Sequence, residues 1–253
     1  MDAARPPPSA RPVAVHPAAF GAAVGTNIVV GLAMAGLGLL AFTFLQTVHD
    51  LSPLRAGLVA LPTIAGSIAG TAVAARLGGR IRPATLVVVG FGLTAGGLAG
   101  VGQLDPDTHV AVFITGYTVL TLGIGILGTL ANTLVLDTAP TERASSAAGT
   151  SETGMVLGEA LGIALFGTVS AAIYQRLMAR DPGIALPDGA GNTVAGDVGI
   201  ARQLPADEAA TLIDAAHEAF TSGFTTVSTT AAVLLTCAAV AAAVALRRVP
   251  ARG

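Results

Sequence analysis

Six long apolar runs separated by short polar segments dominate this sequence. They span residues 18–45, 56–75, 84–101, 110–136, 144–174 and 220–246. Each run meets or nearly meets the roughly 20 residues that an α-helix needs to cross a bilayer. Inside lipid a backbone must satisfy its own hydrogen bonds, so such runs form helices. The pattern predicts an all-α membrane protein with six transmembrane helices.

The composition supports this class of protein. Hydrophobic residues make up 53% of the chain and charged residues 11%, whereas a soluble domain carries about 25% charged residues. The formal net charge of −2 gives no electrostatic argument for a nucleic-acid partner. The single cysteine, Cys237, excludes a disulfide framework, and the four histidines lack the spacing of metal ligands. We therefore expect a protein embedded in the lipid bilayer, with no metal and no cofactor.

The segments outside the apolar runs set the expected domain limits. Residues 1–17 combine proline, alanine and arginine without periodicity, which predicts a disordered cytoplasmic tail. The transmembrane domain covers residues 18–248, and a second cytoplasmic tail covers 249–253. One long connection, 175–219, separates the last two runs. We expect an amphipathic helix in its second half, with a mobile cap of no specific role as the alternative. The apolar stripe of that helix consists of Leu212, Ile213, Ala216 and Phe220.

The arginines predict the orientation in the membrane. Arg76, Arg80 and Arg82 lie in the short connection between the second and third runs, whereas the connection between the third and fourth runs has none. Short loops rich in arginine stay on the cytoplasmic side. Both termini are therefore expected in the cytoplasm, the 175–219 connection outside, and the protein in the cell membrane.

The fifth apolar run, 144–174, contains two carboxylates, Glu152 and Glu159. At about 100° per residue these two side chains fall about 20° apart on a helix. The hydroxyl and aromatic side chains on the same face are Phe166, Ser170 and Tyr174. The glycines on the roughly opposite face are Gly154, Gly158 and Gly162. The run thus predicts a helix with one tightly packed side and one side that lines a pathway.

Glycines recur at small-xxx-small spacing in other runs as well, and this spacing lets helix backbones approach closely in lipid. The further examples are Gly66/Gly70 and Gly92/Gly96/Gly100. They predict a compact helical bundle.

A carboxylate at membrane depth is costly and usually faces a cavity or a partner. Desolvation favours its protonated form, whereas a lipophilic cation in the same cavity favours the charged form. Competition between proton and cation for one carboxylate would couple their movements. Glu152 and Glu159 are therefore the candidate proton and substrate site, and hydrogen bonding between helices is the alternative. Asn132 in the fourth run fits either a structural hydrogen bond or a place beside the pathway.

A bundle of six transmembrane helices is also compatible with an intramembrane serine protease. Such a protease needs a nucleophilic serine flanked by glycines and a histidine within a later span. The nearest stretch is GTSETG, residues 149–154, where Glu152 occupies a glycine position. The last two runs contain no histidine. An enzyme is therefore disfavoured.

Three stretches resemble one family of transporters. They read FTFLQTVHDLSPLRAGLVALP at 42–62, SETGMVLGEALGIALFGTVSAAIY at 151–174 and AFTSGFTTVSTTAAVLL at 219–235. All three resemble the major facilitator superfamily, and most closely its fourteen-helix drug:proton antiporters of the EmrB/QacA type. The resemblance implies proton-coupled efflux of lipophilic or cationic drugs, driven by the proton gradient. It also implies that Glu152 corresponds to the acid of the penultimate helix, whereas Glu159 stands where the family more often has a small residue.

The resemblance covers only the last six helices of such a transporter. It implies half of the superfamily fold, which consists of two inverted three-helix repeats. A homodimer or a separate N-terminal half would then complete the pathway. The alternative is a truncated or scaffold membrane protein without transport of its own. In the arginine-rich connection at Arg76, Arg80 and Arg82, the aspartate that often accompanies arginine in the family is missing.

Overall fold

The computed structural model describes residues 17–138, 144–180, 185 and 189–246, and every regular element in them is an α-helix. The helices are α1 (Pro17–Thr47), α2 (Pro53–Val59), α3 (Leu61–Leu77), α4 (Pro83–Val101), α5 (Val110–Thr138), α6 (Ala144–Met178), α7 (Val194–Ala201) and α8 (Ala206–Leu246). The tails predicted at 1–17 and 249–253 lie outside the described residues, apart from Pro17, with which α1 begins.

Five parts of the described chain are long and apolar enough to cross a membrane. They are Val24–Thr47, Pro53–Leu77, Ala84–Val101, Val110–Thr133 and Ser145–Met178. They correspond to the first five predicted runs. The sixth, 220–246, lies within α8, whose side chains at 238 and 241–246 are outside the description. The all-helical membrane class is therefore confirmed, and the number of six spans stays a prediction.

Proline divides the second span into two helices. α2 ends at Val59 and α3 begins at Leu61, with Pro62 in the first turn of α3. Proline offers no backbone N–H and its ring clashes with the preceding turn, so a helix is interrupted just before it. Ala60 forms the joint between the two pieces.

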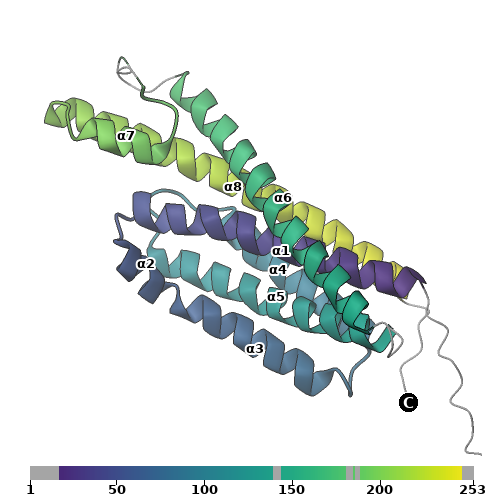
Figure 1. Ribbon diagram of the computed structural model, residues 1–253. Coiled ribbons are helices and arrows are strands. Elements are labelled where there is room, and N and C mark those ends of the chain that lie inside the picture. The colour runs from purple at the N-terminus through teal and green to yellow at the C-terminus, as the bar shows by residue number, and fades with distance from the viewer. Residues whose placement is uncertain (1–16, 139–143, 181–184, 186–188, 247–253) are drawn as a thin grey trace, which may run out of the picture.

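The spans are arranged so that α1 lies between α6 and α5, with α3 on the other side of α5 (Figure 1). Glycine makes these contacts close. A Cβ at Gly158 or Gly162 of α6 would overlap the carbonyl oxygen of Ile28 or Leu32 in α1. In α3, a Cβ at Gly66 would lie 2.7 Å from the Thr118 carbonyl oxygen of α5. The predicted packing role of these glycines is confirmed.

One predicted glycine set does not pack. Around Gly92, Gly96 and Gly100 of α4 there is nothing within 4 Å of an added Cβ, so the packing expected for them is wrong. The contact between α4 and α5 uses other glycines. A Cβ at Gly97 would lie 2.5 Å from the Leu120 backbone nitrogen. The spacing alone could not tell which of the glycine-bearing faces of α4 meets a neighbour.

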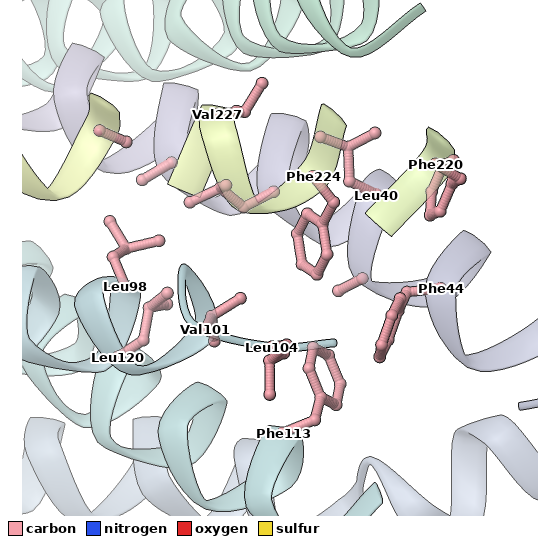
Figure 2. Packing of buried hydrophobic residues seen from close by; sticks show 14 of the residues in the cluster. Leu40, Phe44, Leu98, Val101, Leu104, Phe113, Leu120, Phe220, Phe224 and Val227 are labelled. Atoms are coloured by element: carbon pink, nitrogen blue, oxygen red, sulfur yellow. The ribbon is translucent and has the colours of Figure 1, made fainter. Parts of the chain in front are cut away.

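An aromatic cluster joins α1, α5 and α8 near one end of the bundle (Figure 2). The Phe44 ring centroid lies 5.3 Å from that of Phe113 and 5.6 Å from that of Phe224. All three side chains are at most 1% exposed. These rings make one continuous core of helices that are far apart in the sequence.

The 175–219 connection is more ordered than a loop. α6 continues to Met178, α7 occupies Val194–Ala201, and α8 begins at Ala206 and runs without a break into the last apolar run. On the predicted amphipathic stripe Leu212, Ala216 and Phe220 are buried and Ile213 is half-buried. The helix expected there is confirmed, whereas α7 was not predicted.

Candidate transport site

The glycine side of α6 fixes the position of its two carboxylates. Gly154, Gly158 and Gly162 share the packed side of α6, as the sequence predicts, and the structure shows that this side faces α1. Glu159 is half-buried because its backbone lies against α1, where a Cβ at Gly31 would be 3.1 Å from the Glu159 nitrogen. Glu152, two turns earlier, is exposed. The packed side of the helix thus holds one carboxylate at the edge of the contact with α1 and leaves the other open.

A buried amide lies next to Glu152. Asn27 of α1 is 3% exposed, and its Nδ2 donates hydrogen bonds to the Oγ of Ser151 in α6 and, at 3.2 Å, to the Oδ1 of Asn132 in α5. These three residues form the amide cluster, which joins α1, α5 and α6. The structural hydrogen bond considered for Asn132 is confirmed. Its side chain is nevertheless exposed, so a place beside the pathway stays a prediction.

The sequence reasoning missed Asn27 and Ser151, although a signal existed. Asn27 is an amide inside the first apolar run, and an amide at that depth needs partners on neighbouring helices. Ser151 gave no comparable signal because a helical serine can satisfy its hydroxyl on its own backbone.

The outer part of the predicted pathway face is used for packing. Ser170 is buried, and a Cβ at Gly223 of α8 would lie 2.9 Å from its Oγ. Tyr174 is buried as well, and its hydroxyl donates a hydrogen bond to the Asp197 carboxylate of α7. Phe166 is half-buried against Gly36 of α1. Pathway-lining roles for these side chains stay predictions, and the burial of Ser170 and Tyr174 gives them no support.

Asp197 is a residue that the sequence reasoning did not consider. Its side chain is fully buried, and its Oδ1 accepts a hydrogen bond from the Gly191 N–H at 2.8 Å. Thr193 caps α7 by accepting a hydrogen bond from the Gly196 N–H at 3.1 Å. An aspartate in a polar connection gives no sequence signal for burial. Its contact with Tyr174 attaches α7 to the end of α6.

A shallow pocket of about 560 Å³ lies between α1 and α6. Val24 and Ile28 contribute its apolar wall, and Ser146, Thr150 and Thr153 contribute hydroxyls. The hydroxyls of Thr150 and Thr153 donate to carbonyls of their own helix. Among the described residues that line this pocket there is no carboxylate. The pocket is therefore separate from the charged face of α6.

The arginine cluster lies at the turn between α3 and α4. Arg76 belongs to the last turn of α3, and Arg80 and Arg82 follow before Pro83; all three are exposed. Within the described residues no group of three or more His, Cys, Asp or Glu side chains is arranged to hold a metal ion.

A glycine-packed bundle of long apolar helices, with acidic and amide side chains within those helices, is typical of a multi-pass membrane protein. The sequence profile of the Major Facilitator Superfamily matches residues 3–163. The chain belongs to this superfamily, which separates it from intramembrane enzymes.

The curated relatives are drug efflux and resistance proteins. The chain is 35% identical to the multidrug efflux pump LfrA of Mycolicibacterium smegmatis, over 84% of the chain and 44% of that protein. It is 31% identical to the tetracenomycin C resistance and export protein of Streptomyces glaucescens, over 86% of the chain and 43% of the relative. It is 38% identical to the puromycin resistance protein of Streptomyces alboniger, over 58% of the chain and 30% of that protein. The chain thus spans less than half the length of these relatives.

Proposed function

We propose that this chain is one half of a proton-coupled drug antiporter of the fourteen-helix type, equivalent to its last six helices. Its substrates would be lipophilic or cationic drugs, as the names of its relatives suggest. The observation that carries the proposal is the acidic face of α6, where Glu152 lies exposed beside the amide cluster on a helix whose other side is packed through glycine.

Glu152 would be the group that exchanges a proton for the drug. A carboxylate enclosed by protein and lipid holds its proton until a cation arrives in the same space. Release of the proton toward one side and of the drug toward the other then couples the two fluxes. Asn27 would keep α1, α5 and α6 in register around this site, because its Nδ2 binds side chains of both other helices. Glu159 is a second candidate.

The helix contacts support the two inverted repeats. α1 packs on α6 as α3 packs on α5, and α4 packs on α8. Exchanging the first three spans with the last three exchanges the α1–α6 contact with the α3–α5 contact and leaves the α4–α8 contact unchanged. The exchange of these contacts is what internal pseudo-symmetry in a half transporter predicts. The α4–α5 contact does not follow it, because it is extensive while its counterpart, α1–α8, is small.

The orientation is part of the proposal. The arginine turn between α3 and α4 would face the cytoplasm. Both termini would then be cytoplasmic, and the α1–α2 turn, the α4–α5 turn and α7 would lie outside the cell membrane. The opposing surface for the acidic face of α6 would come from a separate N-terminal half or from a second copy of this chain.

The proposal is tested by ethidium accumulation in an efflux-deficient bacterial host. The chain is expressed alone, and also fused behind the first half of the multidrug efflux relative. We expect the fusion to lower ethidium accumulation and its Glu152→Gln variant to accumulate as much as the empty vector. Efflux by the chain alone would point to a homodimer.

The alternative, a scaffold or remnant without transport, predicts a different result. Neither the chain nor the fusion would then lower accumulation, although membrane fractions contain both proteins. Glu208→Gln serves as the matched control because Glu208 is an exposed glutamate in the first turn of another helix, α8. If the Glu152→Gln variant exports ethidium at the same rate as the Glu208→Gln control, the proposed role of Glu152 is contradicted.

A further inference from the structure

Three of the four histidines come from different segments to one end of the bundle. His49 lies in the turn between α1 and α2, His109 immediately precedes α5, and His217 lies on α8 before its apolar part. His49 and His109 line the same pocket, and both other imidazoles act electrostatically on His49. None of the three belongs to the transport site proposed above. We call these three residues the histidine cluster.

The imidazole of His49 makes an aromatic contact. Its ring meets Phe44 edge to face, with the centroids 5.0 Å apart. Its Nε2 is buried and has no hydrogen-bond partner among the described residues. Burial lowers the pKa of His49 below its ordinary value of 6.5, and the neighbouring His109 and His217 lower this pKa further. A neutral imidazole fits this environment, whereas a charged one would lack partners for its second N–H.

His217 connects α8 to the end of α1. A hydrogen bond to the Thr47 carbonyl engages its ring, and its buried Nε2 has no partner among the described residues. Burial is the largest influence and lowers the pKa of His217. Asp214, the Thr47 carbonyl and Asp50 act in the opposite direction and do not outweigh it.

His109 caps α5 through a nitrogen that must be unprotonated. The Ala111 N–H donates a hydrogen bond to His109 Nδ1 at 3.1 Å. This bond satisfies one of the amide groups that the first turn of a helix leaves without a partner. A proton on Nδ1 would turn the acceptor into a donor and end the cap. An open pocket of about 430 Å³ is lined by His49, His109 and Asp107, among others.

We propose that the histidine cluster is a proton-binding site that holds the α1–α2 turn, the start of α5 and α8 together while its imidazoles are neutral and loosens this end of the bundle when they are protonated. Each ring makes its observed contact in the neutral form. Protonation adds like charges that repel, and it removes the cap of α5. The inference goes beyond drug transport and is tested on the protein without any substrate.

The acidic side chains around the histidine cluster oppose this effect only in part. Asp50 belongs to the α1–α2 turn, Asp107 to the α4–α5 turn and Asp214 to α8. All three are exposed, where water and salt screen their attraction for an imidazolium. The buried nitrogens of His49 and His217 are not shielded in this way.

The sign of the pH dependence follows from the two lowered pKa values. Because the folded state holds His49 and His217 less protonated than the unfolded chain, it binds fewer protons below about pH 6.5. The stability that the cluster contributes is therefore complete above that pH and is lost as the pH falls through it. Acidification should therefore loosen the end of the bundle that carries the histidine cluster.

The direct test is a titration of the histidine ring signals by NMR on the full chain with ¹³C-labelled histidine in nanodiscs. The four signals are assigned with single His→Gln variants. We expect His49 and His217 to titrate below 6.5, and His109→Gln to raise the pKa of His49 because one repelling charge is gone. Titration of His49 and His217 at or above 6.5, or independence of His49 from both neighbours, would overturn the proposal.

Thermal unfolding gives a second readout. Between pH 7.5 and pH 5.5 the wild-type midpoint should fall by about 2–4 °C more than that of the double variant His49→Gln/His217→Gln, which corresponds to about 1 kcal/mol in a chain of this size. Hydrogen exchange, corrected for the intrinsic pH effect, should rise in peptides covering 47–60, 102–112 and 206–219 and stay unchanged around Gly158. An equal fall in both midpoints, or acid-induced exchange around Gly158 alone, would contradict the proposal.

Discussion

The α1–α6 interface and the α3–α5 interface are built in the same way but carry different chemistry. In both, glycines of one helix meet backbone carbonyls of the other. Gly158 of α6 meets the Ile28 carbonyl of α1, and Gly70 of α3 meets the Leu122 carbonyl of α5. Without a hydrophobic force between helices in lipid, such close approach is what stabilises the contact. The shared feature is therefore structural.

The polar groups distinguish the two interfaces. In the α1–α6 interface the buried Asn27 donates to Ser151 of α6 and also reaches Asn132 of α5. Glu159 lies at the edge of this interface, and Glu152 is exposed on the same helix. The α3–α5 interface has threonines, and Thr121 donates its hydroxyl hydrogen to the Thr63 carbonyl at 2.7 Å. Threonine in this role needs no partner that could change its charge. The difference indicates that glycine packing is common to both interfaces, whereas titratable chemistry belongs to α6.

The largest effect on stability is expected from Gly158→Ala and Gly70→Ala. Each new Cβ would overlap a carbonyl oxygen of the facing helix, so the helices must move apart. Both variants should lose about 1–3 kcal/mol of unfolding free energy, measured by thermal or denaturant unfolding in detergent micelles. Gly167→Ala in α6 is the control, since nothing lies within 4 Å of its added Cβ. A stable Gly158→Ala beside a destabilised Gly70→Ala would show that the two interfaces are not built alike.

A smaller loss is expected from Asn27→Leu. The change removes the donor of one buried hydrogen bond, to Ser151 Oγ, and of one part-buried hydrogen bond, to Asn132 Oδ1. The loss should be about 1–2 kcal/mol in the same unfolding measurement. Asn132→Leu removes only one of the two bonds and should cost about half as much. If Asn27→Leu is as stable as the wild type, the amide cluster does not join the three helices.

The smallest effect is expected from Thr121→Val in the α3–α5 interface. Valine keeps the shape of threonine, and only the hydroxyl bonds to the Thr63 and Thr118 carbonyls are lost. The expected loss is about 0.6 kcal/mol. Thr115→Val, whose exposed hydroxyl bonds only within its own helix, is the reference. A loss at Thr121 larger than that at Asn27 would reverse the comparison of the two interfaces.

The helices were predictable from the sequence because membrane spans are recognisable as long runs of apolar residues. The glycine side of α6 was predictable because the helical period alone determines which residues share a face. The partner of a face was not predictable. Gly92, Gly96 and Gly100 have the spacing of packing residues, yet α5 lies against Gly97.

The candidate site was predictable in part. Glu152 and Glu159 stand out because carboxylates are rare at membrane depth. The amide cluster forms because three helices meet at one level. The periodicity within a single run carries no information about which helices meet. The same holds for Tyr174, which shares a helix face with Glu152 in the sequence but contacts α7, an element that the sequence did not predict. α6 changes its neighbours along its length, from α1 near Gly158 to α8 near Ser170.

The most direct test of the account is drug-driven proton movement in inverted membrane vesicles that contain the fusion with the first half of the multidrug relative. A pH-sensitive dye reports the loss of the proton gradient when ethidium is added. The wild-type fusion should dissipate the gradient, and Glu152→Gln should leave it intact while unfolding at the same temperature as the wild type. A Glu152→Gln variant that dissipates the gradient at the wild-type rate would contradict the central claim that this carboxylate exchanges the proton for the drug.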